Sequence, residues 1–237
     1  MQKNIVYEDE HILVVYKPSG IATQTARLGQ QDMVSELKNY LAGKAGNKQK
    51  GEPYLGVVHR LDQPVSGILV FARTKQAASR LGRQITESAF RKYYYAVIYG
   101  SPSHGAGRLE DYLCKDGRTN LTKVVEKDVP EAKRAVLDYR LVKTLVAVEP
   151  WKETSLMEIV LHTGRHHQIR VQMAHADMPL LGDSKYGTRD DRELSREIGL
   201  RNVALCAYKL AFRHPATGEE ICFEQPPREE IFQAFLQ

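Results

Sequence analysis

A histidine, an arginine and an aspartate stand close together at His59, Arg60 and Asp62, between two short apolar runs. The runs are Val57-Val58 and 68–71, and runs of this length bounded by Pro and Gly are typical of strands buried on both faces. A carboxylate at the end of such a strand, beside cations, is held rigidly and is partly shielded from water, which suits a nucleophile. An aspartate in a turn also commonly binds its own backbone, so a catalytic role and a structural role both stay open.

A second polar group runs from His162 to Arg170, and with His175 it contains four histidines, which raises the question of a metal site. His162 and His166 flank Thr163-Gly164, so we do not expect them to share a helical face. The chain has no HExxH motif, and its three cysteines form no CxxC pair. The sequence therefore favours no metal, and a metal-dependent hydrolase stays as an alternative that a chelator would test.

Two arginines, Arg165 and Arg170, stand where the pattern predicts the start of a helix. Cations at a helix N-terminus oppose the helix dipole, so this placement costs stability and hints at a use. A merely solvated, basic helix start is the competing interpretation.

Four tyrosines lie in residues 92–99, which alternate as a strand does. Tyr94 shares one face with Ala96 and Ile98, whereas the other three tyrosines lie on the opposite face. Tyrosines are common in strands, where the ring packs and the hydroxyl stays wet. The residues alone therefore do not single out one functional tyrosine.

Two helices are predicted from apolar spacing. Asp32 can cap the first, which has apolar positions at 34, 37 and 41 and ends at Gly43; Thr74 can cap the second, with a stripe at 77, 78, 81, 85 and 89. Strands are predicted over 5–16 (two) and over most of 123–161, with breaks at Pro130 and Glu149-Pro150, and loops over 43–53 and 101–108. Because helices and strands intermingle without a repeat or linker, we expect an α+β fold. It forms one domain, residues 1–237, on a large, mainly antiparallel mixed β-sheet flanked by helices and loops.

The composition gives a coarser expectation about partners. The 237 residues carry a formal net charge of +5, which favours a polyanionic partner. No apolar run approaches the roughly 18 residues of a membrane span, and no secretion signal opens the chain. With an odd number of cysteines, reduced thiols and a cytoplasmic location are the simplest expectation.

Several segments together resemble one family. Residues 59–67 are similar to the H-R-L-D-x-x-T-S-G signature of the RluA family of RNA pseudouridine synthases, with Val65 where the family usually has threonine. Residues 17–20 resemble the family's K-P-S/A-G motif, residues 92–98 its K-x-Y-x-A-x-V motif, and residues 163–170 its T-G-R-x-H-Q-I/L-R motif. Residues 179–187 resemble its P-x-x-G-D-x-x-Y-G motif, and residues 214–218 its H-P-x-T-G motif. The resemblance runs from about Ile5 to Pro227.

The resemblance implies a pseudouridine synthase fold in a compact form without a preceding S4 domain. It also implies a monomeric isomerase that acts on rRNA or tRNA without a cofactor. Asp62 is then the nucleophile, Arg170 keeps it ionised with Arg165 as the fallback, and Tyr94 stacks on the flipped uracil and serves proton transfer at C5. The implied substrate-binding residues are Arg60, His59, Arg165, Lys17 and Ile169.

A non-catalytic RNA-binding module on the same fold is the alternative from another functional class. Binding alone needs no buried acid, so the presence of Asp62, Tyr94 and two arginines argues against it. We expect loops such as 43–53 and 101–120 to influence which RNA is chosen.

Overall fold

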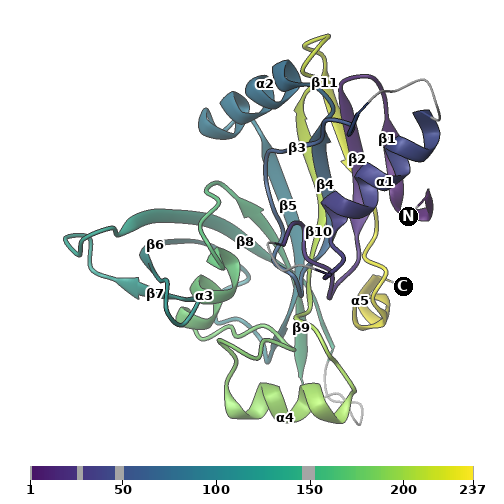
Figure 1. Ribbon diagram of the computed structural model, residues 1–237. Helices are drawn as coiled ribbons and strands as arrows, with labels where there is room; N and C mark the ends of the chain where they lie inside the picture. The colour runs from purple at the N-terminus through teal and green to yellow at the C-terminus, as the bar shows by residue number, and fades with distance from the viewer. Residues whose placement is uncertain (1, 26–28, 46–50, 146–152, 237) are drawn as a thin grey trace. The chain divides into compact units, whose positions relative to one another are not determined.

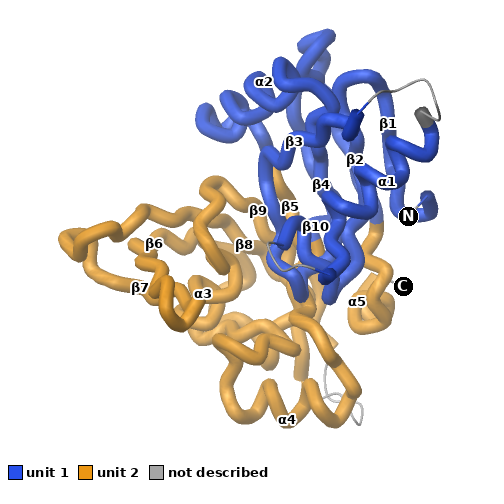
Figure 2. Tube along the Cα trace, in the orientation of Figure 1, with its two compact units in different colours: residues 1–91, 207–225 blue, residues 92–206, 226–237 orange. Residues whose placement is uncertain are grey.

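The computed structural model describes residues 2–25, 29–45, 51–145 and 153–236, which include five α-helices and eleven strands (Figure 1). The chain divides into two compact units (Figure 2). The first unit consists of residues 1–91 and 207–225, and the second of residues 92–206 and 226–237. Each unit therefore combines two segments that are distant in sequence, and the single domain expected over 1–237 stays a prediction.

The first unit is built on strands in the order β1 (Ile5–Glu8), β2 (Ile12–Lys17), β4 (Ser66–Ala72) and β10 (Leu205–Arg213). The short β3 (Gly56–Val57) pairs with β4, and β11 (Glu220–Glu224) pairs with β10. β2 and β4 run antiparallel, from Ile12 opposite Ala72 to Lys17 opposite Gly67. Every residue of both strands is buried, which confirms the prediction for the 68–71 run, whereas the Val57 strand is only half-buried.

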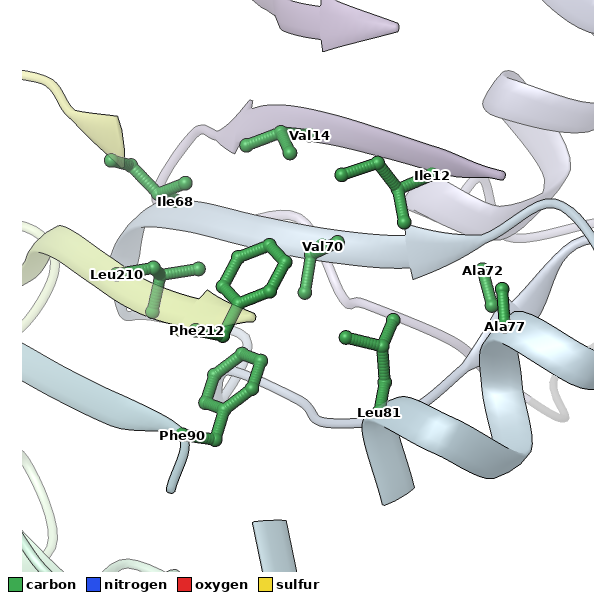
Figure 3. Packing of buried hydrophobic residues seen from close by; sticks show 10 residues of the cluster. All are labelled: Ile12, Val14, Ile68, Val70, Ala72, Ala77, Leu81, Phe90, Leu210 and Phe212. Carbon is green, nitrogen blue, oxygen red and sulfur yellow. The ribbon is translucent and has the colours of Figure 1, made fainter. Parts of the chain in front are cut away.

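Alternate side chains of these strands form one core with α2 (Lys75–Thr86), as Figure 3 shows. The core contains Ile12, Val14, Ile68, Val70, Ala72, Ala77, Leu81, Phe90, Leu210 and Phe212. The Thr74 side chain accepts a hydrogen bond from the backbone N–H of Ala77, so the predicted N-cap is confirmed. The helix ends at Thr86, and Phe90, rather than the predicted Ala89, enters the core by stacking on Phe212.

The first helix, α1 (Met33–Ala45), is also capped as predicted. Asp32 Oδ1 accepts from the backbone N–H of Ser35 at 2.7 Å, which satisfies an N–H of the first helical turn. The helix continues two residues beyond Gly43, since a glycine lowers helix propensity by only about 1 kcal/mol. Residues 46–50 of the loop predicted over 43–53 lie outside the described residues.

The second unit is an antiparallel series of strands in the order β5 (Arg91–Tyr99), β9 (Thr154–Leu161), β8 (Lys133–Leu145), β6 (Ala106–Asp116) and β7 (Leu121–Val125). α3 (Gln168–His175) lies against β6 and β7 (Figure 1), and α4 (Arg189–Glu197) and α5 (Glu230–Leu236) belong to the same unit. The predicted break at Pro130 separates β7 from β8, and the break at Glu149-Pro150 lies outside the described residues. The predicted α+β fold with mainly antiparallel pairing is confirmed.

The loops expected over 101–108 and 101–120 are wrong in extent, because the strand β6 spans Ala106–Asp116. Exposed charged residues of β6 pair with charged residues of β8 across the sheet. Arg108 Nε lies 2.6 Å from Asp138 Oδ1, and Arg134 Nε lies 2.6 Å from Glu110 Oε1. Exposed pairs of this kind each contribute little stability, but opposite charges on facing strands favour one register.

Within the described ranges no helix is long and apolar enough to cross a membrane.

Candidate active site

Asp62 lies in the loop 58–65 between β3 and β4, which we call the Asp62 loop. The aspartate is half-buried, and its carbonyl accepts a hydrogen bond from the N–H of Val65 at 3.0 Å. Thr23 clamps the preceding residue, because its hydroxyl donates to the Leu61 carbonyl at 2.9 Å and accepts from the Leu61 N–H at 3.2 Å. The backbone on the N-terminal side of Asp62 is therefore held in both hydrogen-bonding directions.

The residue after Asp62 is held just as firmly. The Gly20 N–H donates to the Gln63 carbonyl at 2.9 Å, and Gln63 Nε2 donates to the Gly20 carbonyl at 3.0 Å. The Lys17 ammonium joins the same segments by donating to the carbonyls of Pro18 (3.0 Å), Ile21 (2.6 Å) and Gln63 (3.0 Å). The Lys17 side chain is fully buried, so it supports the Asp62 loop from behind and does not extend to the surface where a phosphate would bind.

The two residues before Leu61 have different surroundings. His59 is half-buried, its Nε2 accepts from the N–H of Val70 in β4 at 3.2 Å, and its ring lies 5.1 Å from that of Phe90. His59 therefore continues the pairing of β4 where β3 ends. Arg60 is exposed, and we find no hydrogen bond or ion pair to its guanidinium within the described ranges.

Gly67, at the start of β4, is fixed by a close approach of two backbones. Its φ is +119°, and a Cβ there would lie 2.3 Å from the carbonyl oxygen of Ala207 and 2.5 Å from its nitrogen. Any other residue would be strained in that conformation and would also push β10 away. This explains the glycine that closes the segment beginning at His59.

In the second unit, β5 presents Tyr94 on its buried face. Tyr94 is 5% exposed and shares this face with Lys92 and Ala96, whereas Tyr93, Tyr95 and Tyr99 are half-buried. The predicted alternation is therefore confirmed.

Arg170 lies in the first turn of α3 and forms a bidentate ion pair with Asp183. Its Nε is 2.7 Å from Asp183 Oδ2, and its Nη2 is 2.6 Å from Asp183 Oδ1. Arg170 is 4% exposed and Asp183 is 1% exposed, so both charges are removed from water. Burial alone would raise the pKa of Asp183, but hydrogen bonds and charge from Arg170 outweigh it and lower that pKa.

The loop that carries Asp183 is tied to the same carboxylate. The backbone N–H groups of Lys185 and Tyr186 donate to Asp183 Oδ1 at 2.9 and 3.2 Å, and the N–H of Gly187 donates to the Asp183 carbonyl at 3.0 Å. The Tyr186 ring also lies 5.3 Å from the Arg170 guanidinium carbon. The arginine is therefore held at its edge by a carboxylate and at its face by an aromatic ring.

Two histidines pack at the entry to α3. His167 has a left-handed backbone with φ of 52°, its Nδ1 lies 2.8 Å from the Tyr186 hydroxyl, and its ring stacks on His166 at 3.7 Å. Burial, and then the nearby Arg170 charge, lower the pKa of His167 to about 3. The ring is therefore neutral near pH 7 and leaves Arg170 as the charged group of this helix start.

The remaining predicted residues are near Arg170 in the chain. Ile169 is buried within α3, and Arg165 is exposed, with its Nε donating to the Arg134 carbonyl at 2.9 Å. Gln168 ties the turn together, because its Oε1 accepts from the Thr163 hydroxyl and from the Arg165 N–H.

The histidines proposed for a metal have other neighbours. His162 lies 2.7 Å from Asp138, His175 lies 3.1 Å from Asp111, and His166 binds the Thr122 hydroxyl at 2.8 Å. No group of three or more His, Cys, Asp or Glu in the described part of the chain could hold a metal ion.

The predicted residues therefore fall into two sets. His59, Arg60, Asp62 and Lys17 gather on or behind one loop of the first unit, and Tyr94, Arg165, Ile169 and Arg170 lie on β5 and at the start of α3 in the second. The pairing expected between Asp62 and Arg170 stays a prediction. Sequence reasoning missed Asp183 as a partner of Arg170, although the P-x-x-G-D-x-x-Y-G match contained it.

Comparisons with known proteins identify the family to which the chain belongs. Residues 11–175 match the family model described as RNA pseudouridylate synthase. The chain is 36% identical over 225 residues to ribosomal large subunit pseudouridine synthase D of Zymomonas mobilis, covering 93% of this chain and 68% of the relative. It is 33% identical over 232 residues to the uncharacterized RNA pseudouridine synthase YlyB of Bacillus subtilis, covering 98% and 71%.

Solved structures share the fold. Human RNA pseudouridylate synthase domain containing 4 superposes with a TM-score of 0.73 at 24% identity, over 96% of this chain and 90% of that chain. Human RNA pseudouridylate synthase domain containing 1 superposes with a TM-score of 0.74 at 22% identity, over 94% of this chain and 83% of that chain. The predicted pseudouridine synthase fold is thereby confirmed.

Proposed function

Since the chain belongs to the RNA pseudouridylate synthase family, whose members isomerise uridine in RNA, we propose that it converts specific uridines of ribosomal RNA to pseudouridine with Asp62 as the nucleophile. The names of the relatives favour ribosomal RNA over tRNA as the substrate. The observation that carries the assignment of Asp62 is the fixed backbone on both sides of a half-buried carboxylate.

The reaction breaks the C1′–N1 bond, joins C1′ to C5, removes the proton from C5 and leaves a proton on N1. Atoms and electrons balance within the nucleotide, so the proposal needs no cofactor, oxidant or metal. The target uridine is stacked in RNA and must be flipped out, which costs a few kcal/mol that contacts to the RNA must supply. Asp62 attacks the flipped nucleotide and is released when the new bond forms.

A nucleophile gains from a backbone that does not have to reorganise during the reaction. Thr23 and Gly20 hold the neighbours of Asp62, and Lys17 holds Gln63. We therefore assign Lys17 a positioning role in place of the direct substrate contact expected from sequence. His59, which pairs with β4, positions the same loop, and exposed Arg60 contacts RNA.

Arg170 keeps Asp62 ionised in this proposal. A guanidinium stays charged when buried and binds carboxylates along its edges. Asp183 binds Nε and Nη2, which fixes the plane of the guanidinium. In the proposal, Nη1 binds Asp62. Arg165 is the weaker candidate, because it is exposed and its Nε already binds a backbone carbonyl.

Tyr94 stacks on the flipped uracil, a contact worth about 1–3 kcal/mol per base, and its hydroxyl serves proton transfer at C5. Its burial separates it from the three half-buried tyrosines of β5. Ile169, buried beside Arg170, lines the base site in the proposal. The enzyme acts as a monomer in the cytoplasm.

Mapping pseudouridine in ribosomal and transfer RNA tests the function. We compare cells with the gene, without it, and complemented with wild-type protein or with Asp62→Asn. One or a few ribosomal sites should vanish without the gene, return with the wild type and stay absent with the variant. Restoration by Asp62→Asn would support a non-catalytic RNA-binding role instead, and sites lost only from tRNA would overturn the choice of substrate.

A further inference from the structure

Lys92 is a buried cation that the reaction described above does not use. It lies two residues before Tyr94 on the same face of β5, opposite Leu161 of β9, and it is only 8% exposed. Across the described ranges its ammonium has no hydrogen-bond acceptor or carboxylate partner. Burial lowers the pKa of Lys92, as expected for an amine held out of water without a compensating charge.

Gly164 lies next to this amine. A Cβ at position 164 would come within 3.3 Å of Lys92 Nζ, which is tighter than an ordinary contact. Gly164 is exposed and its φ is outside the left-handed region, so the backbone alone does not require glycine there. What the missing side chain does is leave the Lys92 ammonium within reach from the surface.

We propose that Lys92 binds a backbone phosphate of the RNA at the nucleotide whose base stacks on Tyr94, and that the phosphate approaches over Gly164. This proposal rests on the proposed function. An ammonium has three donors and no acceptor, so a phosphate oxygen satisfies it well. A buried cation without a protein counter-charge is costly until a ligand brings the anion, and every nucleotide of RNA carries one.

The spacing fits a single nucleotide. Residues two apart in a strand are separated by about 6.6 Å, so the base and the phosphate of one nucleotide occupy neighbouring positions of the β5 face. Exposed Arg165, next to Gly164 in the chain, adds positive charge at the same entrance. Lys92 is then a substrate-binding residue that registers the target nucleotide while Tyr94 receives its base.

The test measures RNA affinity in an Asp62→Asn background, so that turnover does not disturb binding. The variants are Lys92→Met, which removes the charge, and Gly164→Ala, which keeps the charge and adds a methyl group about 3.3 Å from the Lys92 ammonium on the side of the proposed approach. Lys38→Met removes a charge from α1, where Lys38 pairs with Glu52, and serves as the control. Dissociation constants for a ribosomal RNA fragment are measured from low to high salt.

We expect Lys92→Met to weaken binding about tenfold or more, as for the loss of a charged hydrogen bond. The logarithm of the association constant falls linearly with the logarithm of the salt concentration. The steepness of this line should decrease by about 0.7, the value for one phosphate contact on a single strand. Gly164→Ala should weaken binding in the same direction, and Lys38→Met should change neither quantity. Lys92→Met should unfold at or above the wild-type temperature, because no hydrogen bond is lost; if it does not fold, Gly164→Ala decides.

The proposal is overturned if Lys92→Met leaves both the RNA affinity and the salt slope unchanged. If that variant does not fold, unchanged RNA affinity in Gly164→Ala overturns it. A further result would also overturn it: Lys92→Met with Asp62 intact binds RNA with unchanged affinity but forms pseudouridine more slowly in a single turnover. The amine would then act on the base and not on a phosphate. Pseudouridine formation by the wild type is measured in parallel. If the wild type forms none while the Lys92 effects persist, the proposed function fails and the phosphate site stands.

Discussion

The Asp62 loop and the segment around Arg170 are both tied to the surrounding structure, but by different kinds of interaction. Neutral backbone hydrogen bonds to Thr23 and Gly20, together with the Lys17 ammonium, hold the Asp62 loop. A buried ion pair with Asp183 holds Arg170. The first arrangement joins segments 38–46 residues apart and fixes a backbone. The second joins two charges 13 residues apart and fixes a side chain.

The two buried lysines sharpen this contrast. The Lys17 ammonium donates to three carbonyls and its side chain is fully buried, so it is satisfied within the protein. Lys92 is nearly as buried but lacks such acceptors in the described part of the chain. A buried cation that is satisfied supports structure, and one that is not is suited to a ligand.

Breaking the ion pair should have the largest effect on stability. Arg170→Met leaves Asp183 buried without its cation, and we expect a loss of about 3–5 kcal/mol of unfolding free energy. Urea unfolding measures it. The control, Arg134→Met, breaks the exposed pair with Glu110 and should cost less than about 1 kcal/mol. Equal losses in the two variants would contradict the difference drawn between buried and exposed charges.

Removing Lys17 should have a smaller but clear effect. Lys17→Met leaves three carbonyls without this donor, and we expect a loss of about 1–3 kcal/mol in the same urea assay. Turnover should fall more than RNA affinity, because the Asp62 loop loses a support. Lys92→Met should cost no stability, so similar destabilisation by the two substitutions would remove the contrast between the lysines.

The smallest effect concerns pH. The pKa of His167 is about 3 in the folded protein against 6.5 in the unfolded chain, so the unfolded chain binds the proton more readily. The contribution of His167 is complete above pH 6.5 and is lost as the pH falls towards 3, by at most about 1.4 kcal/mol per pH unit. The lowered pKa of Asp183 acts only below its ordinary value of 3.8.

His167→Asn removes the titrating ring and tolerates the left-handed backbone. Unfolding free energies at pH 7 and pH 5 should therefore differ less in this variant than in the wild type. The same difference in both proteins would show that His167 is not the group that destabilises the fold in mild acid.

The sequence predicted those parts of the fold that periodicity and turn residues determine locally. The strands around Val70 and Tyr94 and the helix caps at Asp32 and Thr74 follow from apolar spacing and side-chain chemistry. α4 was missed because its sequence, RDDRELSRE, has only one apolar residue and so shows no buried stripe. Its first turn is instead stabilised by a capping box between Thr188 and Asp191.

The candidate site was predictable as a set of residues but not as a set of contacts. Motif resemblance gave Asp62 and Arg170 as candidates, and their roles stay predictions. The partnership of Arg170 with Asp183 depends on tertiary packing that spacing does not reveal. The same limit applies to Lys17. The resemblance implied that Lys17 contacts the substrate, whereas the fold surrounds its ammonium with three backbone carbonyls.

The most direct test of the central claim is tritium release from RNA labelled at C5 of uridine, because forming the C1′–C5 bond expels that hydrogen. We predict that purified wild-type protein releases tritium from its target RNA. Asp62→Asn should bind the same RNA with unchanged affinity and release none. Release by Asp62→Asn at the wild-type rate would contradict the assignment of Asp62 as the nucleophile.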